Sequence, residues 1–405
     1  MKFAYFMPKS FCRSSWFVRL AVNFTVILLF LGCIRQPYGE PILIENIVES
    51  EKIEVYIDPA FARAQEIVSG MDNRLLAAQV LISGIDGAGR LRPYMAELLT
   101  EIPTGGIMLF KYNLDTDNDS IRSLVTQTKA VILEESGIAP FMAVDHEGGS
   151  VIRFNREIVS LPSAAAYWEL FEKEGMNAAL LKIARDSLKD ALVINELGIN
   201  MNFAPVAEHL TDDNRVFYSR RSYGPDPDFT ARASLAFLQS MEKAGIICVV
   251  KHFPASAGTD PHYSKSVLNS KEDELDELVS PFAYLIKKGA RAIMAAHTLI
   301  PAVDSEIASL SSVVMRNWLR GGLGFDGIIV SDDFIMAAAG NQKPETAAVL
   351  SLAAGSDMIL VWPANLRKTH NAIITAVENE SLSRDRLADA AVRIVYQKIT
   401  MGLMD

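Results

Sequence analysis

The sequence has few cysteines and no excess of positive charge. Its 405 residues include three cysteines, and 39 Lys and Arg stand against 49 Asp and Glu, which gives a net charge of −10. Nucleic-acid-binding domains normally carry a clustered basic surface, so this balance argues against a DNA or RNA partner. Cys12 and Cys33 lie near the N-terminus and Cys248 lies in an apolar run. We therefore expect no disulfide within the folded part of the chain.

The first 33 residues have the pattern of a signal peptide. Basic residues precede an apolar run at 20–34, which is shorter than the roughly 20 residues that a membrane-spanning helix needs. The run contains LFLGC at 29–33, which resembles a bacterial lipoprotein signal in which Cys33 would be lipidated; ordinary cleavage and an uncleaved anchor are the alternatives. We expect an exported, periplasmic or otherwise extracytoplasmic protein, anchored in the membrane only through Cys33, with a linker at 34–58 and one domain at 59–405.

From residue 60 onward, short apolar runs alternate with helical patterns. The runs occupy residues 78–85, 106–110, 140–144, 199–206, 246–250, 290–296, 327–330 and 357–362. The helical patterns between them include residues 121–134, 178–197, 230–244, 271–288 and 345–354. Near-continuous apolar strands indicate a parallel sheet covered on both faces, and eight such units are the number in a TIM barrel. The sequence therefore predicts an α/β fold, a single-domain (β/α)₈ TIM barrel.

Polar residues follow four of the runs directly, at the strand ends where such a barrel places its active site. Asp145 follows the third run, Lys251 and His252 the fifth, His297 the sixth and Asp332 the seventh. The rival fold, an open doubly wound sheet with a bound dinucleotide, would need a glycine-rich phosphate turn after its first strand. The glycines after the first run match that turn only partly, so this pattern favours the barrel.

These side chains could perform acid–base or nucleophilic chemistry. Asp332 could act as a nucleophile or base, although a carboxylate at this position could also begin a helix as its N-cap. Asp260 could orient the imidazole of His262 for proton transfer, or the two could form a solvated turn. Lys251 and His252 could donate hydrogen bonds to a polar ligand, or His252 could be a satisfied residue at the end of a strand.

A metal site is a further alternative. Asp145, His252, His297 and Asp332 could ligate Zn²⁺ from neighbouring strand ends. Metal-dependent hydrolases with this fold usually draw a His-x-His pair from the first strand, and the first run contains no histidine. The metal-dependent hydrolase therefore stays as the weaker alternative.

Several longer motifs resemble those of glycoside hydrolase family 3, in its N-terminal-type barrel and its β-N-acetylglucosaminidase (NagZ-like) branch. Residues 145–154 read DHEGGSVIRF, similar to DQEGGRVQRF, and residues 198–206 read GINMNFAPV, similar to GINLDFAPV. Residues 221–227 read RSYGPDP, residues 251–254 read KHFP, and residues 324–333 read GFDGIIVSDD, which resembles the strand that carries the nucleophile. The resemblance extends from about residue 60 to residue 400.

The resemblance implies a role for each candidate residue. Asp332 would attack the anomeric carbon and form a glycosyl-enzyme, with overall retention of configuration. His262, paired with Asp260, would protonate the leaving oxygen and then deprotonate the incoming water. The hydroxyl groups of the terminal sugar would be held by Asp145, Arg153, Arg221, Lys251 and His252.

Together these features predict a retaining exo-β-N-acetylglucosaminidase that releases terminal β-linked GlcNAc from peptidoglycan fragments or related oligosaccharides. The resemblance implies neither a metal nor an organic cofactor, and we expect a monomer. The acid–base loop departs from the family pattern, because residues 255–257 read ASA where the family has GHG, and Pro261 replaces a serine. A sugar-binding surface lipoprotein without catalysis is therefore an alternative.

Overall fold

The computed structural model describes residues 58–155, 157–258, 263–336 and 342–404. The predicted leader at 1–33, with Cys12 and Cys33, lies outside the described residues. The chain divides into two compact units, Met1–Ala62 and Arg63–Asp405. Within the part of the chain that the structure describes, no helix is long and apolar enough to cross a membrane.

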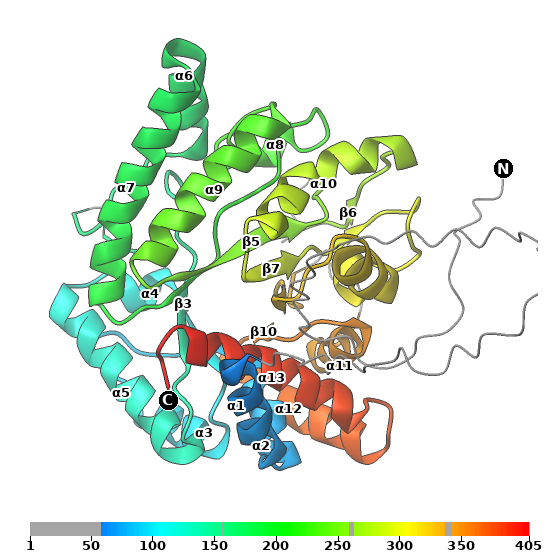
Figure 1. The fold of residues 1–405 in the computed structure, drawn as a ribbon. Helices are drawn as coiled ribbons and strands as arrows, with labels where there is room; N and C mark the ends of the chain where they lie inside the picture. The colour runs from blue at the N-terminus through cyan, green and yellow to red at the C-terminus, as the bar shows by residue number, and fades with distance from the viewer. Residues whose placement is uncertain (1–57, 156, 259–262, 337–341, 405) are drawn as a thin grey trace, which may run out of the picture. The chain divides into compact units, whose positions relative to one another are not determined.

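Eight parallel strands form the centre of the second unit (Figure 1). In their order around the sheet, they are β10 (Ile359–Val361), β1 (Leu81–Gly84), β2 (Gly106–Leu109), β3 (Phe141–Val144), β4 (Met201–Asn202), β5 (Ile247–Phe253), β7 (Ala292–Ala295) and β9 (Ile328–Ser331). A parallel bridge between Val330 and Met358 joins β9 to β10. The two ends of the sheet thus meet, which confirms the predicted TIM barrel.

The residues of these strands are buried along their whole length. This pattern is typical of parallel strands that face packed side chains inside the barrel and helices outside it. A second, two-stranded parallel sheet pairs β6 (Ser266–Val267) with β8 (Thr298–Leu299), beyond the ends of β5 and β7. This small sheet therefore lies on the side of the barrel that holds the C-terminal ends of β5 and β7.

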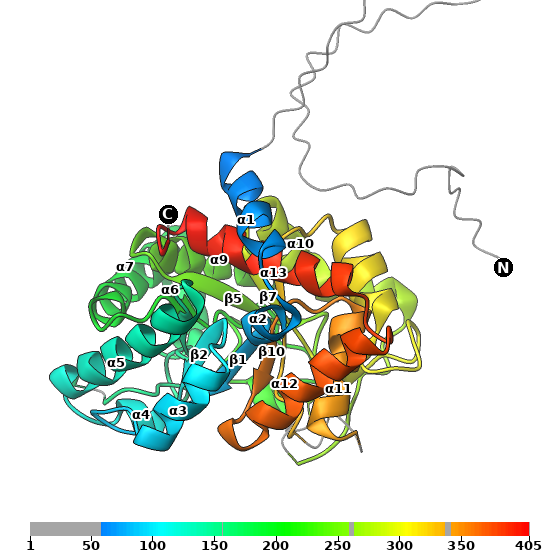
Figure 2. The same cartoon turned by 90° about the horizontal axis from the view of Figure 1, so that it is seen from below.

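Helices surround the strands (Figures 1 and 2). They are α1 (Pro59–Ser69), α2 (Asn73–Gln79), α3 (Pro93–Glu101), α4 (Lys111–Leu114), α5 (Asn118–Ser136), α6 (Ala164–Glu174), α7 (Met176–Glu196), α8 (Arg215–Tyr218), α9 (Pro227–Lys243), α10 (Glu272–Lys287), α11 (Pro344–Ala354), α12 (Pro363–Glu378) and α13 (Arg384–Thr400), with the short helices η1 (Ala308–Leu310) and η2 (Val313–Gly322). Helix α2 packs against α12 and α13 (Figure 2).

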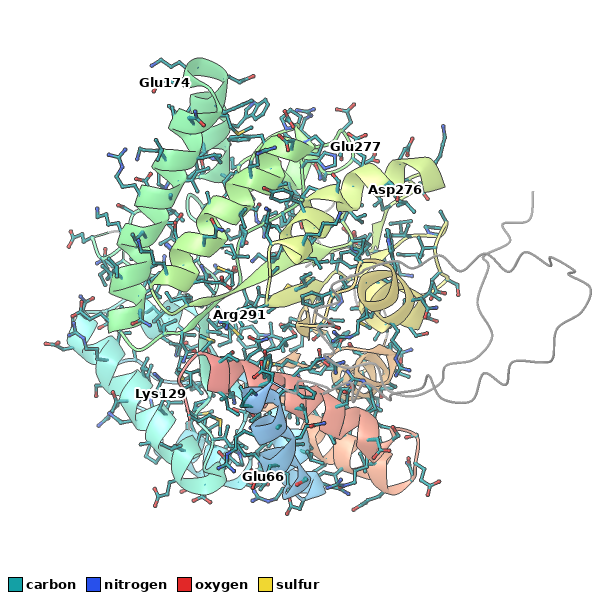
Figure 3. The ribbon with its side chains drawn as sticks, viewed as in Figure 1. Glu66, Lys129, Glu174, Asp276, Glu277 and Arg291 are labelled. Carbon is teal, nitrogen blue, oxygen red and sulfur yellow. The ribbon has the colours of Figure 1, made fainter. Side chains whose placement is uncertain are left out.

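Helix α10 illustrates how the sequence pattern produces this layer. Leu275, Leu278 and Phe282 recur at helical spacing and are buried. Phe282 packs in the barrel core, whereas Leu275 and Leu278 pack in a smaller cluster with Ala255 and Ile300. Asp276 and Glu277 lie on the opposite, exposed face, where Figure 3 shows their position. The helix therefore packs one apolar stripe against the barrel and the segments beyond β5, and presents charge to solvent.

The structure corrects several predicted boundaries. The first run begins at residue 78 in the prediction, but residues 73–79 form α2 and the strand begins at Leu81. The fourth strand is limited to Met201–Asn202, in part because Pro205 has no N–H to donate to a neighbouring strand. The fifth strand is longer than predicted and ends at Phe253, so Lys251 and His252 lie within β5 rather than after it.

A buried carboxylate, that of Asp357, holds the N-terminal ends of strands β9 and β10 together. Asp357 is fully buried and its Oδ2 accepts a hydrogen bond of 2.8 Å from the Ile329 N–H. Three arginines from η2 and α13 surround it, namely Arg320, Arg386 and Arg393. Burial raises the pKa of the Asp357 carboxyl, but the arginines outweigh burial and lower it. Asp357 thereby holds in place the strand that carries Asp332 at its other end.

Candidate active site

A cavity of about 510 Å³ lies at the C-terminal ends of the barrel strands. The predicted site residues that the structure describes all line it, and they are Asp145, Arg153, Arg221, Lys251, His252 and Asp332. Asp260 and His262, the predicted acid–base pair, lie outside the described residues. Strand ends and the family resemblance together therefore predict six cavity side chains that are widely separated in the sequence.

Five charged side chains form a chain of alternating sign along the cavity. Arg153 Nη2 lies 2.6 Å from Asp145 Oδ2, and Lys251 Nζ lies 2.6 Å from Asp145 Oδ1. Lys251 Nζ also lies 2.6 Å from Glu147 Oε1. Arg221 completes the chain with two parallel hydrogen bonds of 2.7 Å to the Glu147 carboxylate. Each side chain is held by its neighbours, so the donors and acceptors are positioned before any ligand arrives.

A tight glycine turn after β3 directs Asp145 and Glu147 into this chain. Gly148 has φ +92°, and a Cβ at this position would lie 2.3 Å from the carbonyl oxygen of Pro162. The Glu147 N–H donates to the Val151 carbonyl at 3.0 Å, across the turn. Only glycine fits this backbone conformation without strain and this close approach.

The ion pairs keep both carboxylates of the chain ionised. Burial raises the pKa of the Asp145 carboxyl, but Lys251 and Arg153 outweigh it and the pKa is lowered. Burial likewise opposes ionisation of Glu147, and the charges of Arg221 and Lys251 reverse that effect and lower its pKa. Both groups are therefore hydrogen-bond acceptors at neutral pH.

We expect Glu147→Gln to destabilise the fold by about 3 kcal/mol at pH 7, because it leaves Lys251 and Arg221 without one buried counter-charge. A carboxylate whose pKa is lowered by folding stabilises the native state above its unfolded pKa, near 4, and loses that contribution as the pH falls through the folded pKa. The difference in free energy of unfolding between wild type and variant should therefore narrow below about pH 4. Denaturant titrations at several pH values measure it.

Asp119→Asn is the matched control for that prediction. Asp119 pairs with Arg122 at 2.7 Å, but its side chain is 93% exposed. An exposed pair contributes little to stability, so this variant should unfold like wild type at every pH. A difference for Glu147→Gln that stays constant down to pH 2 would contradict the assigned charge state.

Asp332 follows β9 and projects into the cavity. Its Oδ1 accepts a hydrogen bond of 2.8 Å from the Asp333 N–H. Asp333, rather than Asp332, caps the following turn, since its Oδ1 accepts from the Ile335 N–H at 3.0 Å. The N-cap alternative predicted for Asp332 thus fits its neighbour better. The Asp332 side chain is half-buried and directed to the cavity.

An aromatic wall stands beside Asp332. Phe110 and Trp362 line the cavity, with their rings stacked at 4.5 Å between centroids and 8° between planes. Tyr112 continues the stack, with its ring 5.8 Å from that of Phe110. The indole N–H of Trp362 donates to the Asp333 carboxylate, and Gly84 leaves room for Phe110 because a Cβ there would lie 2.9 Å from its ring.

The arrangement gives no support to the metal alternative. His297, one of the four proposed ligands, is buried outside the cavity wall, with its Nδ1 2.7 Å from Ser309 Oγ and its ring stacked on Phe334. Burial lowers its pKa. In residues 58–404, apart from the gaps in the description, no group of three or more His, Cys, Asp or Glu side chains could hold a metal ion.

The family model of the glycosyl hydrolase family 3 N-terminal domain matches residues 73–396, which include the whole barrel and the charge chain. The chain belongs to glycosyl hydrolase family 3. As a member of this family it is a glycoside hydrolase, and the predicted family is confirmed.

Curated and solved family 3 proteins resemble the chain over most of its length. Beta-hexosaminidase of Neisseria gonorrhoeae is 32% identical over 279 residues, which are 68% of this chain and 75% of that protein. Beta-hexosaminidase of Methylococcus capsulatus is 33% identical over 303 residues, with 73% and 85% covered.

Two solved structures share the fold. A family 3 beta-N-acetylglucosaminidase from Paenibacillus sp. has a TM-score of 0.74 and 28% identity, and the match covers 82% of this chain and 63% of that one. NagZ from N. gonorrhoeae, in complex with N-trifluoroacetyl-D-glucosamine, has a TM-score of 0.66 and 27% identity, with 78% and 97% covered.

Three features of this family 3 hydrolase were not predicted as parts of the site. Glu147 lies between the two cations Lys251 and Arg221, and its place within the DHEGG motif was the available signal. Glu208 holds His252 from outside the cavity, with its Oε1 2.7 Å from the imidazole Nδ1. The aromatic wall consists of residues that a sequence pattern assigns to strand ends, so nothing local distinguishes them from core residues.

Proposed function

We propose that this family 3 hydrolase is a retaining exo-β-N-acetylglucosaminidase that acts on peptidoglycan fragments or related amino-sugar oligosaccharides. The observation that carries the proposal is the convergence of Asp332 and five hydrogen-bonding side chains on one cavity, in a chain whose curated relatives are beta-hexosaminidases. The NagZ structure of N. gonorrhoeae with bound N-trifluoroacetyl-D-glucosamine supports an amino sugar as the ligand.

In the first chemical step, Asp332 attacks the anomeric carbon of the terminal sugar. A covalent bond forms between Asp332 and the sugar while the glycosidic bond breaks. His262, oriented by Asp260, gives its proton to the departing oxygen. Because the carboxylate displaces the leaving group from the opposite face, the intermediate has inverted configuration.

In the second step, water displaces the carboxylate and restores the original configuration. His262, now neutral, takes a proton from the water, so the same group serves as acid and then as base. The sugar leaves as the β-anomer, and Asp332 is regenerated. No step requires another reactant.

Recognition of the sugar rests on the charge chain. Arg153, Arg221 and Lys251 offer donors to hydroxyl oxygens, Asp145 offers an acceptor to hydroxyl protons, and His252 offers an imidazole nitrogen. Their mutual ion pairs fix the geometry in advance, which reduces reorganisation as positive charge develops on the sugar ring. Trp362 and Phe110 present ring faces and edges beside Asp332 that fit the apolar C–H surface of a sugar.

The deciding measurement is the release of an aryl group from an aryl β-N-acetylglucosaminide by the protein that starts at residue 34. The proposal predicts chelator-resistant release and, by NMR, β-GlcNAc as the first product. The matching β-glucoside should be a poorer substrate. Activity lost to chelator would favour a metal-dependent hydrolase, and binding of GlcNAc without turnover would favour a sugar-binding lipoprotein.

We also propose that the protein is exported and lipid-anchored through Cys33, and that it acts as a monomer. The motif that ends at Cys33 supports the anchor. Expression of the full chain in a bacterium should place the protein in the membrane fraction, with a diacylglyceryl modification found by mass spectrometry. Cys33→Ser should abolish the modification; an unmodified wild-type protein in the soluble fraction would contradict the anchor.

A further inference from the structure

Glu208 lies behind the cavity, in the segment that follows β4, and is only 2% exposed. It is not one of the residues that line the cavity. Burial of a carboxylate is costly unless hydrogen bonds or charges compensate for it. Its surroundings therefore show what holds it there.

The Glu208 carboxylate is surrounded by hydrogen-bonding groups of two residues. Its Oε1 accepts a hydrogen bond from the backbone N–H of His252 at 3.2 Å and lies 2.7 Å from Nδ1 of the His252 imidazole. Its Oε2 accepts from the Ser256 N–H at 2.6 Å, and the Ser256 hydroxyl donates to Oε1 at 3.2 Å. Glu208 thus connects strand β5 with the first turn beyond it.

These contacts select one tautomer of His252. An ionised carboxylate can only accept a hydrogen bond, so the Nδ1 that faces it carries a proton. The Tyr218 hydroxyl lies 3.3 Å from the same nitrogen and donates to Ser256 Oγ at 3.1 Å, which leaves the Glu208 oxygen as the acceptor. The imidazole also lies against the Tyr218 ring, at 5.8 Å between centroids.

We propose that Glu208 is a positioning residue, which holds His252 as the Nδ1–H tautomer and directs Nε2 into the cavity to bind a hydroxyl of the sugar. The role of His252 in sugar binding rests on the proposed function; the tautomer does not. Lys251 is held from the other side by Asp145 and Glu147, so each residue of the Lys-His pair has its own carboxylate support. Glu208 acts on the substrate only through the imidazole.

The variant Glu208→Gln tests this role. The amide keeps the shape of the side chain but loses the charge, and its NH₂ group must face a donor at Ser256 or His252. We expect kcat/KM to fall about 10- to 100-fold, as is typical when the group that orients a functional histidine is lost. Glu208→Asp keeps the charge and should recover part of the loss. Asp119→Asn, which changes a carboxylate that is 93% exposed, is the control, and its activity should stay within about twofold of wild type.

A double variant separates positioning from a general structural effect. If Glu208 acts through His252, then Glu208→Gln should cause almost no further loss in a His252→Asn background. Losses that multiply in the double variant would overturn the proposal. Differential scanning fluorimetry of each variant shows whether it is folded at the assay temperature.

Nitrogen-15 NMR of the histidine side chains tests the tautomer without turnover. His252, assigned by comparison with His252→Asn, should show a protonated Nδ1 and an unprotonated Nε2 in wild type, and a mixture in Glu208→Gln. An Nε2–H tautomer in wild type would overturn the proposal. Because this readout needs no substrate, an inactive wild type would count against the proposed glycosidase while the tautomer result would still decide the role of Glu208.

Discussion

Asp332→Asn is expected to lower kcat for an aryl β-N-acetylglucosaminide by about 10,000-fold, the loss typical of a removed nucleophile. The amide oxygen is far less nucleophilic than the carboxylate, so the glycosyl-enzyme no longer forms. The geometry should survive, since the amide oxygen can still accept the hydrogen bond from the Asp333 N–H. Steady-state kinetics, with free GlcNAc as a competitive ligand, separate the loss of chemistry from a loss of binding.

Asp333→Asn is the matched control, because Asp333 also lines the cavity but contributes to the turn and to the Trp362 contact. Its activity should fall far less, about tenfold or below. The variant Asp332→Ala adds a chemical test. Azide should enter the space left by the carboxylate and give the α-glycosyl azide, the inverted product. Equal losses in the two Asn variants, with no azide product, would contradict the role of Asp332.

His262→Ala is expected to lower turnover by about 100-fold or more for substrates with poor leaving groups, such as a disaccharide. The alkoxide that leaves from a sugar needs a proton, whereas an activated aryl group leaves without one. The loss should therefore be much smaller for a nitrophenyl glycoside. A plot of log kcat/KM against leaving-group pKa should become steeper in the variant.

Asp260→Asn should give an intermediate loss, because the imidazole stays but its orienting carboxylate is gone. In His262→Ala, the fall of kcat/KM on the alkaline side of the pH profile should disappear, because the imidazole must be protonated to act as the acid in the first step. Small and equal effects on both kinds of substrate would contradict the role of His262. The departures at Ala255 and Pro261 would then indicate that this loop does not supply the acid–base group.

Periodicity carried most of the fold prediction. Eight apolar runs and the polar residues after them predict a barrel and the end of it that holds the site, because strand burial and strand direction are local properties of the chain. The errors lie at boundaries such as that of β5, where Lys251 and His252 continue the strand. In a sequence, charged residues after an apolar run indicate the end of a strand, because the buried partners that pair with them are not visible there.

The site was predicted only as far as its residues could be recognised one at a time. The Arg221–Glu147 pair spans 74 residues of sequence and the Lys251–Asp145 pair spans 106. No local pattern reports such contacts. For the same reason Glu208 was not among the predicted site residues, whereas tertiary structure gives it four contacts with His252 and Ser256.

The alternating charge chain also limits how the protein can evolve. Removal of one charge takes a counter-charge away from a buried neighbour, which costs about 3–5 kcal/mol where that neighbour has no other partner, whereas exchange of both partners can be nearly neutral. Arg221 and Glu147 should therefore be inherited as a pair, and a lineage that acquires a new sugar preference should change them together. Single replacements of these five charged residues should be rare among descendants, even where the new side chain would fit the new sugar.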